Sequence, residues 1–273
     1  MTLALNSYSL EQYQTQQTAL KQVSFNEQLL EQYSKQLDCC ENSKRTYLYN
    51  IKKFLEWLEQ YNNAAAIDYS VLIAYKGYLK MNYKTSAVNT SITALKDFSR
   101  YLERNGFKNY AKDIKKERIS SDFKRDSLTL EQVKAIYRSI DTTTETGARA
   151  NALFRLLIGT GLRECEVVRA NIEDIRNIGD KTVLYIRGKG ETEKNKYVVL
   201  CSSVMDSLQT YFKYRPNAKG NEALFTSKSN RNNGQRITVR TVQRIVKGLY
   251  KDNGIVNNRL TTHSTRHTAY HYC

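Results

Sequence analysis

Two short segments, far apart in the chain, carry the side chains with the clearest potential for chemistry. The first reads GTGLRECE, residues 159–166, and the second reads HSTRH, residues 263–267. Arginine is always charged and its planar guanidinium can grip two oxygens of a phosphate, whereas histidine exchanges protons near neutral pH. Together these side chains predict a phosphodiester site. An ordinary Arg-Glu pair on a helix is the alternative for the first segment taken alone.

The residues around Arg163 predict how this side chain is positioned. Apolar residues recur at helical spacing before Gly159, so we expect a buried helix that ends where Gly159 and Gly161 permit a backbone reversal. A second short helix should begin near Arg163, where backbone N–H groups favour an anion. Glu166, one turn later, can brace the guanidinium.

The composition favours a polyanionic partner. The chain has 273 residues, with 43 Lys and Arg against 27 Asp and Glu, and a formal net charge of +16. This excess favours nucleic acid before a membrane surface, although a merely soluble basic protein has the same charge. No apolar run approaches a membrane span, and the N-terminus lacks the pattern of an export signal. Five cysteines without zinc spacing indicate reduced thiols, so we expect a cytoplasmic protein.

The pattern along the chain predicts a mainly α-helical protein with a small β-hairpin or sheet, of the α+β class. We expect a polar arm over residues 1–23, a helical bundle over 24–107, a charged linker over 108–126 and a second domain over 127–273. Asn105 and Gly106 predict the end of the last helix of the bundle. Thr129 and Gln132 predict a capping box where the second domain begins.

Two further features of the second domain carry positive charge. Residues 182–187 and 197–201 predict the strands of a hairpin, and Lys189 lies between glycines in the connection, with Lys194 and Lys196 as nearby substitutes. A later amphipathic helix carries Arg240 and Arg244 on its polar side, which favours DNA binding. A solvated basic face is the alternative for that helix.

The three histidines, at 263, 267 and 271, have the spacing of one face of a helix, which suggests a metal site. No carboxylate is placed beside them in the sequence, and a single helix is a poor cage for an ion. We therefore expect no metal and no cofactor.

The ordered set GLRxxE, Gly188-Lys189-Gly190 and HxxRH resembles the tyrosine recombinase, or phage integrase, family, with XerC/XerD-like site-specific recombinases among its members. The resemblance runs from about Ser24 to the end of the chain. It implies a helical core-binding domain and a catalytic domain that close on double-stranded DNA, and DNA integration or recombination, as in a mobile element. It also implies a homo-oligomer on DNA, a tetramer in the family.

The resemblance assigns roles to individual residues. The arginines would hold the non-bridging oxygens, the lysine would protonate the leaving 5′ oxygen, and a tyrosine would attack phosphorus to give a 3′-phosphotyrosyl intermediate without metal or ATP. The implied catalytic residues are Arg163, Lys189, His263 and Arg266, with Glu166 and His267 in support. The implied DNA contacts are Lys44, Arg45, Lys84, Thr85, Arg240 and Arg244, each of which is otherwise a solvated surface residue.

The family's attacking tyrosine is not recognisable in this sequence. The family places it a few tens of residues beyond the second arginine, whereas this sequence ends two helical turns after Arg266. Tyr270 and Tyr272 lie in that stretch, but we expect them to be ordinary helix residues. The departure predicts a C-terminally truncated or frameshifted product with weakened self-association.

Three functions therefore stay open. The first is a recombinase that has lost its nucleophile segment or receives its tyrosine from another subunit. The second is a catalytically inactive DNA-binding fragment. The third is a helical regulator that binds DNA or RNA and has no catalytic ancestry.

Overall fold

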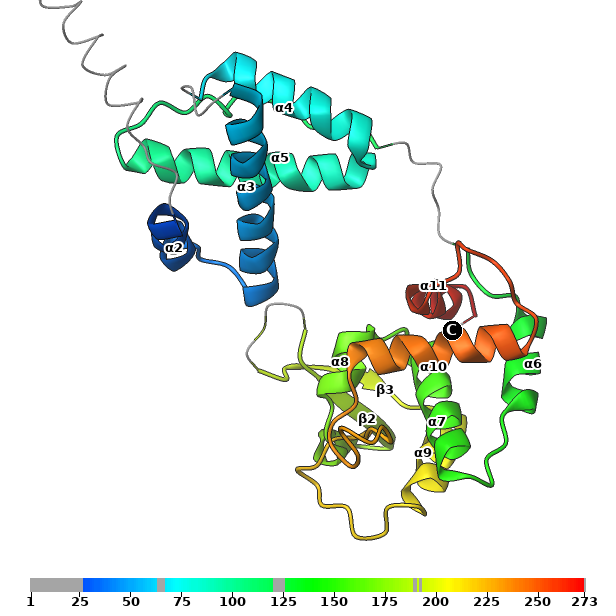
Figure 1. Ribbon diagram of the computed structural model, residues 1–273. Coiled ribbons are helices and arrows are strands. Elements are labelled where there is room, and N and C mark those ends of the chain that lie inside the picture. The colour runs from blue at the N-terminus through cyan, green and yellow to red at the C-terminus, as the bar shows by residue number, and fades with distance from the viewer. Residues whose placement is uncertain (1–26, 63–66, 120–125, 189–190, 192, 273) are drawn as a thin grey trace, which may run out of the picture. The chain divides into compact units, whose positions relative to one another are not determined.

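The computed structural model describes residues 27–62, 67–119, 126–188, 191 and 193–272 (Figure 1). The predicted polar arm therefore lies outside the described residues. The chain divides into two compact units, Met1–Ser121 and Asp122–Cys273. Helices dominate both units, and a three-stranded antiparallel sheet lies in the second, so the predicted α+β class is confirmed. Within the described residues, no helix is long and apolar enough to cross a membrane.

The first unit is a bundle of four described helices with one apolar core. The helices are α2 (Glu27–Gln36), α3 (Glu41–Asn62), α4 (Tyr69–Asn82) and α5 (Thr85–Arg104). In Figure 1 α3 crosses α5, and these two helices are in contact. Ile51 and Phe54 of α3 are fully buried with Phe98 of α5, because apolar residues at helical spacing give each helix one core-facing side. The last helix ends at Arg104 with Asn105 as its C-cap, and Gly106 follows with φ 88°, where the sequence predicts the end of the helix.

Residues 107–119, most of the predicted linker, pack on this bundle. Ala111 and Ile114 are completely buried in its core. The backbone N–H of Glu117 donates to Asn89 Oδ1 at 2.8 Å, and Asn89 Nδ2 donates back to the Glu117 carbonyl at 2.9 Å. The Glu117 carboxylate pairs with Lys76 at 2.7 Å. This part of the predicted charged linker is therefore fixed on the bundle by buried apolar residues, hydrogen bonds and the ion pairs of Glu117.

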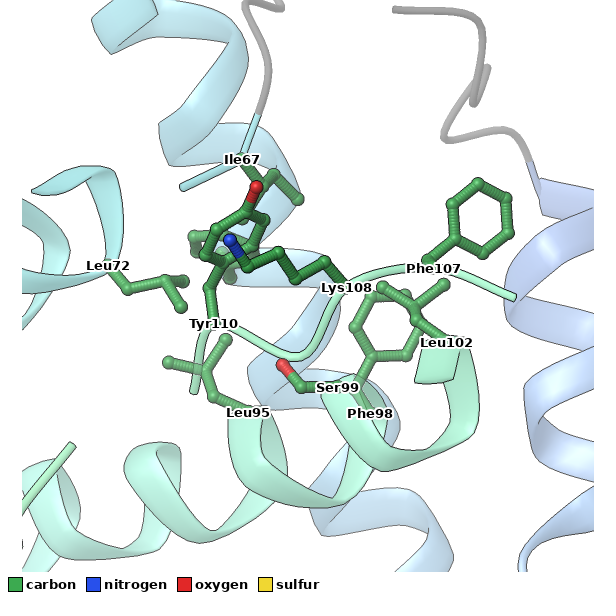
Figure 2. A pocket seen from close by; sticks show the side chains of 10 residues that line it. Ile67, Leu72, Leu95, Phe98, Ser99, Leu102, Phe107, Lys108 and Tyr110 are labelled. Atoms are coloured by element: carbon green, nitrogen blue, oxygen red, sulfur yellow. The ribbon is translucent and has the colours of Figure 1, made fainter. Parts of the chain in front are cut away.

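A small apolar cavity lies beside the start of this segment (Figure 2). Phe98 and Leu102 of α5 line it together with Phe107 and Tyr110, and its volume is about 40 Å³. This space holds a few water molecules at most, and its walls are largely apolar. The cavity is therefore a packing gap rather than a ligand site.

The second unit surrounds one buried helix, α7. Its elements are α6 (Leu130–Ser139), α7 (Glu145–Thr160), α8 (Glu164–Arg169), the 3-10 helix η1 (Ile172–Asp174), β1 (Ile175–Ile178), β2 (Lys181–Ile186), β3 (Lys196–Val199), α9 (Ser202–Phe212), α10 (Val239–Asp252) and α11 (Thr262–Tyr272). Leu153, Phe154 and Leu157 of α7 are fully buried, and α9 and α11 both pack against this helix. The predicted capping box of Thr129 and Gln132 is present at the start of α6.

The predicted hairpin is the β2–β3 pair. Its strands run antiparallel, with Val183 opposite Val199 and Ile186 opposite Lys196. On its other side β2 pairs with β1, a strand that the sequence pattern does not predict. Strand β1 has only four residues and is mostly exposed, so it lacks the apolar alternation that identifies a strand in a sequence.

Candidate active site

The backbone reversal between α7 and α8 places Arg163. Gly161 has φ 63° and its N–H donates to the Leu157 carbonyl at 3.0 Å, which ends α7 in a left-handed cap. A Cβ at Gly161 would lie 3.3 Å from the Ala269 Cβ of α11. Glycine is therefore required by the backbone angle and favoured by the close approach of α11. Arg163 follows as the N-cap residue of α8.

Glu166 fixes Arg163 through two contacts. Its Oε2 accepts the backbone N–H of Arg163 at 2.8 Å, and its Oε1 accepts a hydrogen bond from Arg163 Nη1 at 2.9 Å. Glu166 is only 3% exposed, whereas the Arg163 side chain is 43% exposed. The carboxylate thus anchors one edge of the guanidinium from within the protein, and the arginine still reaches solvent.

Arg266 lies on α11 and is tied to the same turn. Its Nη1 donates to the carbonyl of Gly161 at 2.7 Å, although the two residues are 105 positions apart in the sequence. Helix α11 is held in place by a buried polar side, where Thr268 Oγ1 accepts the Leu128 N–H and donates to the Ser264 carbonyl. The structure therefore brings Arg163 and Arg266 to one turn of backbone.

Tyr270 contacts Arg266 on the same helix. Arg266 Nη2 donates to its hydroxyl at 2.5 Å, and the Arg266 guanidinium lies 5.2 Å from the centre of its ring. The pKa of Arg163 is raised, mainly by the hydrogen bond and charge of Glu166, with smaller contributions from Cys165 and Tyr270. The Arg266 guanidinium therefore contacts the hydroxyl and ring of Tyr270, which is 68% exposed.

Two histidines of α11, His263 and His267, flank Arg266 in the sequence. The rings of His263 and His267 meet edge to face, with 5.2 Å between their centres. Both side chains are half-buried, so each has access to solvent for proton exchange. The part of the chain that the structure describes contains no cluster of three or more His, Cys, Asp or Glu side chains that could hold a metal ion.

The hairpin lysines have different surroundings. Lys189 lies outside the described residues. Lys194 Nζ is 2.6 Å from the carboxylate of Asp174, which is almost fully buried. Lys196 pairs with Glu191. Lys194 and Lys196, the two alternatives to Lys189, therefore each form an ion pair with a carboxylate.

The model of the phage integrase family matches residues 126–271, and the model of the phage integrase N-terminal SAM-like domain matches residues 27–106. The chain belongs to the phage integrase family. The predicted resemblance to tyrosine recombinases is confirmed.

Individual relatives agree with this assignment. A tyrosine recombinase of Synechococcus elongatus is 27% identical over 241 residues, which cover 84% of this chain and 74% of the relative. The XerC tyrosine recombinase of Caldanaerobacter subterraneus subsp. tengcongensis is 30% identical over 211 residues, 75% of this chain and 56% of the relative. The chain therefore spans little more than half the length of the second relative.

The fold is similar to that of a phage integrase of known structure. A lambda integrase tetramer, solved bound to a Holliday junction, matches with a TM-score of 0.66 at 14% identity, over 99% of this chain and 84% of that one. At this identity the match shows a shared fold.

The six predicted DNA-contact residues of this integrase-family chain lie at or near the surface. In the first unit Lys84 is the N-cap of α5 and is exposed with Thr85, and Arg45 is exposed near the start of α3. Lys44 is half-buried, with its Nζ 3.6 Å from Glu41. In the second unit, the remaining two residues belong to a groove.

This basic groove runs along α10 and has a volume of about 560 Å³. Arg240, Arg244 and Lys247 contribute its charge, and hydroxyl and amide side chains such as Ser229 and Asn232 form most of the rest. None of the described residues that line it is acidic. Such a surface suits a phosphate backbone.

Sequence reasoning missed one feature of the site. It is the Gly161 carbonyl that holds Arg266, because a backbone contact over this separation leaves no pattern in the sequence. The contact of Arg266 with Tyr270 agrees with their four-residue spacing, since side chains at i and i+4 of a helix are neighbours.

Proposed function

We propose that this integrase-family chain binds double-stranded DNA and holds one phosphodiester between Arg163 and Arg266. The reaction is breakage and rejoining of a DNA strand through a phosphotyrosyl intermediate, as in site-specific recombination or integration. It needs no cofactor, because the phosphotyrosyl bond conserves the energy of the broken phosphodiester.

The observation that carries this proposal is the convergence of the two arginines at the Gly161 turn. Each guanidinium has one nitrogen anchored within the protein, by Glu166 or by the Gly161 carbonyl. The remaining donors can bind the non-bridging oxygens of a phosphate. Donors that are fixed beforehand stabilise the extra negative charge of the transition state without reorganising.

Proton transfer is assigned to Lys189 and His263. Lys189 would protonate the leaving 5′ oxygen, and His263 would assist transfer beside Arg266. The support for Lys189 is indirect: the nearby Lys194 and Lys196 are both paired with carboxylates. Glu166 and His267 act through their neighbours, by holding Arg163 and by packing against His263.

In this proposal, phosphates of the DNA bind two basic surfaces of the chain. One is the groove of Arg240 and Arg244, and the other is the α3 and α5 ends that carry Lys44, Arg45, Lys84 and Thr85. On DNA the chain assembles as a homo-oligomer, by analogy with the lambda integrase tetramer of the same fold.

A selection from random-sequence duplexes tests the DNA-binding half of the proposal. Duplexes that bind the full chain are separated by their retarded migration in a gel over several rounds. The sequences of the recovered duplexes are then compared. We expect a shared site. If retention does not depend on sequence and RNA competes as well as DNA does, the proposal of site-specific recombination fails in favour of general nucleic-acid binding.

Arginine variants test the phosphodiester site. In Arg163→Lys and Arg266→Lys a point charge replaces the planar fork, so binding of the selected duplex should fall only a few-fold while cleavage falls by roughly a hundredfold or more. Arg138→Lys, on the exposed side of α6, is the matched control. Loss of cleavage without loss of binding supports the proposal, whereas binding with no cleavage in the parent chain identifies an inactive DNA-binding protein.

A further inference from the structure

The first unit carries a strip of aromatic side chains on its surface. Part of the strip recurs every four residues along α3, so these side chains lie along one side of that helix. The rest comes from the C-terminal end of α4. The members of this aromatic strip are Tyr49, Lys53, Trp57 and Tyr61 of α3, Tyr78 of α4 and Tyr83, the C-cap of α4.

The rings of the aromatic strip form a continuous series of contacts. Trp57 and Tyr61 stack in parallel, with 4.5 Å between the ring centres and 15° between the planes. The Trp57 ring lies 6.0 Å from that of Tyr78, which in turn lies 6.5 Å from that of Tyr83. The strip is therefore one surface built from two helices, and not a set of scattered exposed residues.

Lys53 places a cation within this surface. Its Nζ lies 4.9 Å from the centre of the Tyr49 ring and 4.8 Å from that of Tyr83. It also donates to the Tyr83 hydroxyl at 3.1 Å, and this hydrogen bond lowers the pKa of Tyr83. Hydrogen bonds with the two phenols raise the pKa of Lys53. The ammonium is therefore held in its charged form between two rings.

Most of these rings are exposed although a buried aromatic core lies beneath them. Tyr49 and Tyr61 are 59% and 58% exposed, and Tyr78 is 39% exposed. By contrast Tyr75, which contacts both Trp57 and Tyr78, is 1% exposed and belongs to the core. A contiguous exposed aromatic surface of this kind marks an interaction site.

The position of the strip favours DNA as its partner. Tyr83 directly precedes Lys84, and Tyr49 lies one helical turn after Arg45, so the strip adjoins two of the proposed phosphate contacts. The net charge of +16 also favours a polyanion over a second copy of the chain.

The ring faces favour unpaired bases over a duplex. In a duplex each base is stacked on its neighbours, so its faces are not accessible to a protein ring. Tyr61 uses one face on Trp57 and is 58% exposed, which leaves its other face available. Aromatic rings that stack bases beside a cation that binds the backbone are how proteins hold single strands.

We propose that the aromatic strip binds unpaired DNA, with bases stacked on Tyr61 and Tyr78 and a phosphate bound by Lys53. The choice of DNA rests on the proposed function, through the neighbouring Arg45 and Lys84. The inference goes beyond that function, because it assigns a second, single-strand site to a chain proposed to bind duplex DNA. Strand breakage creates unpaired bases, which this site can hold.

Trp57 gives a direct measurement, because it is the only tryptophan in the sequence. The full chain is titrated with a single-stranded oligothymidylate of about 10 nucleotides, a length typical of stacking sites. An abasic strand of the same length and charge is the control. We expect the oligothymidylate to quench Trp57 fluorescence and to bind roughly tenfold or more tightly than the abasic strand. Equal binding of the two strands overturns the inference, because phosphates alone would then account for it.

Leucine variants test the individual rings. Tyr61→Leu and Tyr78→Leu keep an apolar side chain but remove the stacking surface, so each should weaken oligothymidylate binding by roughly fivefold or more. Tyr69→Leu is the matched control, at a 48% exposed tyrosine of α4 outside the strip, and should bind within about twofold of the parent chain. Anisotropy of a labelled oligothymidylate measures the affinities, and circular dichroism melting curves show that each variant is folded.

The outcomes separate this inference from the proposed function. Parental oligothymidylate binding by both strip variants overturns the single-strand site and leaves duplex binding and cleavage standing. Trp57 fluorescence that changes with protein concentration in the absence of DNA identifies a second copy as the occupant, and also overturns it. Failure to select a duplex, together with strip-dependent binding of the oligothymidylate, overturns the proposed duplex function and leaves the single-strand site standing.

Discussion

At the scale of single residues, Glu166 combines two tasks that are usually separate. It accepts the N–H that begins α8 and it anchors the Arg163 guanidinium. Glu166→Ala removes both contacts, and Arg163 can turn to solvent because its side chain is already partly exposed. We expect a loss of about 1–3 kcal/mol in the free energy of unfolding of the second unit.

Denaturant unfolding of the full chain measures this loss. Glu164→Ala, at the neighbouring carboxylate of the same helix, is the control and should change stability by no more than about 0.5 kcal/mol. Equal effects of the two substitutions would show that Glu166 contributes only helix propensity. Binding of the selected duplex should weaken in Glu166→Ala alone.

A second prediction at this scale compares Gly161 with Gly179, a glycine with a similar backbone angle. Gly161 and Gly179 both have positive φ, of 63° and 58°, but only Gly161 has atoms within 4 Å of an added Cβ. Gly179→Ala should therefore cost about 1–2 kcal/mol for the left-handed backbone alone. Gly161→Ala should cost more and should also weaken duplex binding, since the carbonyl that holds Arg266 must move. Equal losses in denaturant unfolding would contradict the proposed tight contact with α11.

At the scale of elements, the helices could be predicted and their mutual placement could not. Apolar spacing predicted α3, α5, α7 and α10 because burial of one face is a local property of the sequence. Strand β1 left no such signal, since it is short and exposed. The contact of α11 with Gly161 depends on residues 105 positions apart, so the sequence showed which residues could form the site but not which atoms meet.

The ion pairs of the segment 107–119 predict how the stability of the first unit changes at acidic pH. Hydrogen bonds from Lys76 and Lys80 lower the pKa of Glu117 from its ordinary value of 4.5. A carboxylate with a lowered pKa stabilises the folded state fully above its unfolded pKa and loses that contribution as the pH falls through the folded pKa. The melting temperature of the first unit should therefore fall more steeply below pH 4.5 in the parent chain than in Glu117→Gln. Parallel pH profiles for the two proteins would show that the ion pairs contribute nothing.

At the scale of the whole molecule, the net charge of +16 should appear in the salt dependence of DNA binding. Each phosphate neutralised by the protein adds about −0.9 to the slope of log affinity against log salt, because counterions are released. If Arg240 and Arg244 both contact phosphates, Arg240→Ala and Arg244→Ala should each reduce the magnitude of this slope by about 1. Affinity at low salt should fall in parallel.

A matched control separates contact from overall charge. Lys181→Ala removes the same charge from an exposed residue at the start of β2, outside the groove. If binding depended on the net charge alone, all three variants would show the same slope. If the DNA backbone binds in the groove, Arg240→Ala and Arg244→Ala should show reduced slopes of log affinity against log salt. Lys181→Ala should keep the slope of the parent chain. Fluorescence anisotropy of a labelled duplex over a salt series measures these slopes. The charge of the chain then acts through a defined surface, as the proposed binding of one phosphodiester by Arg163 and Arg266 requires.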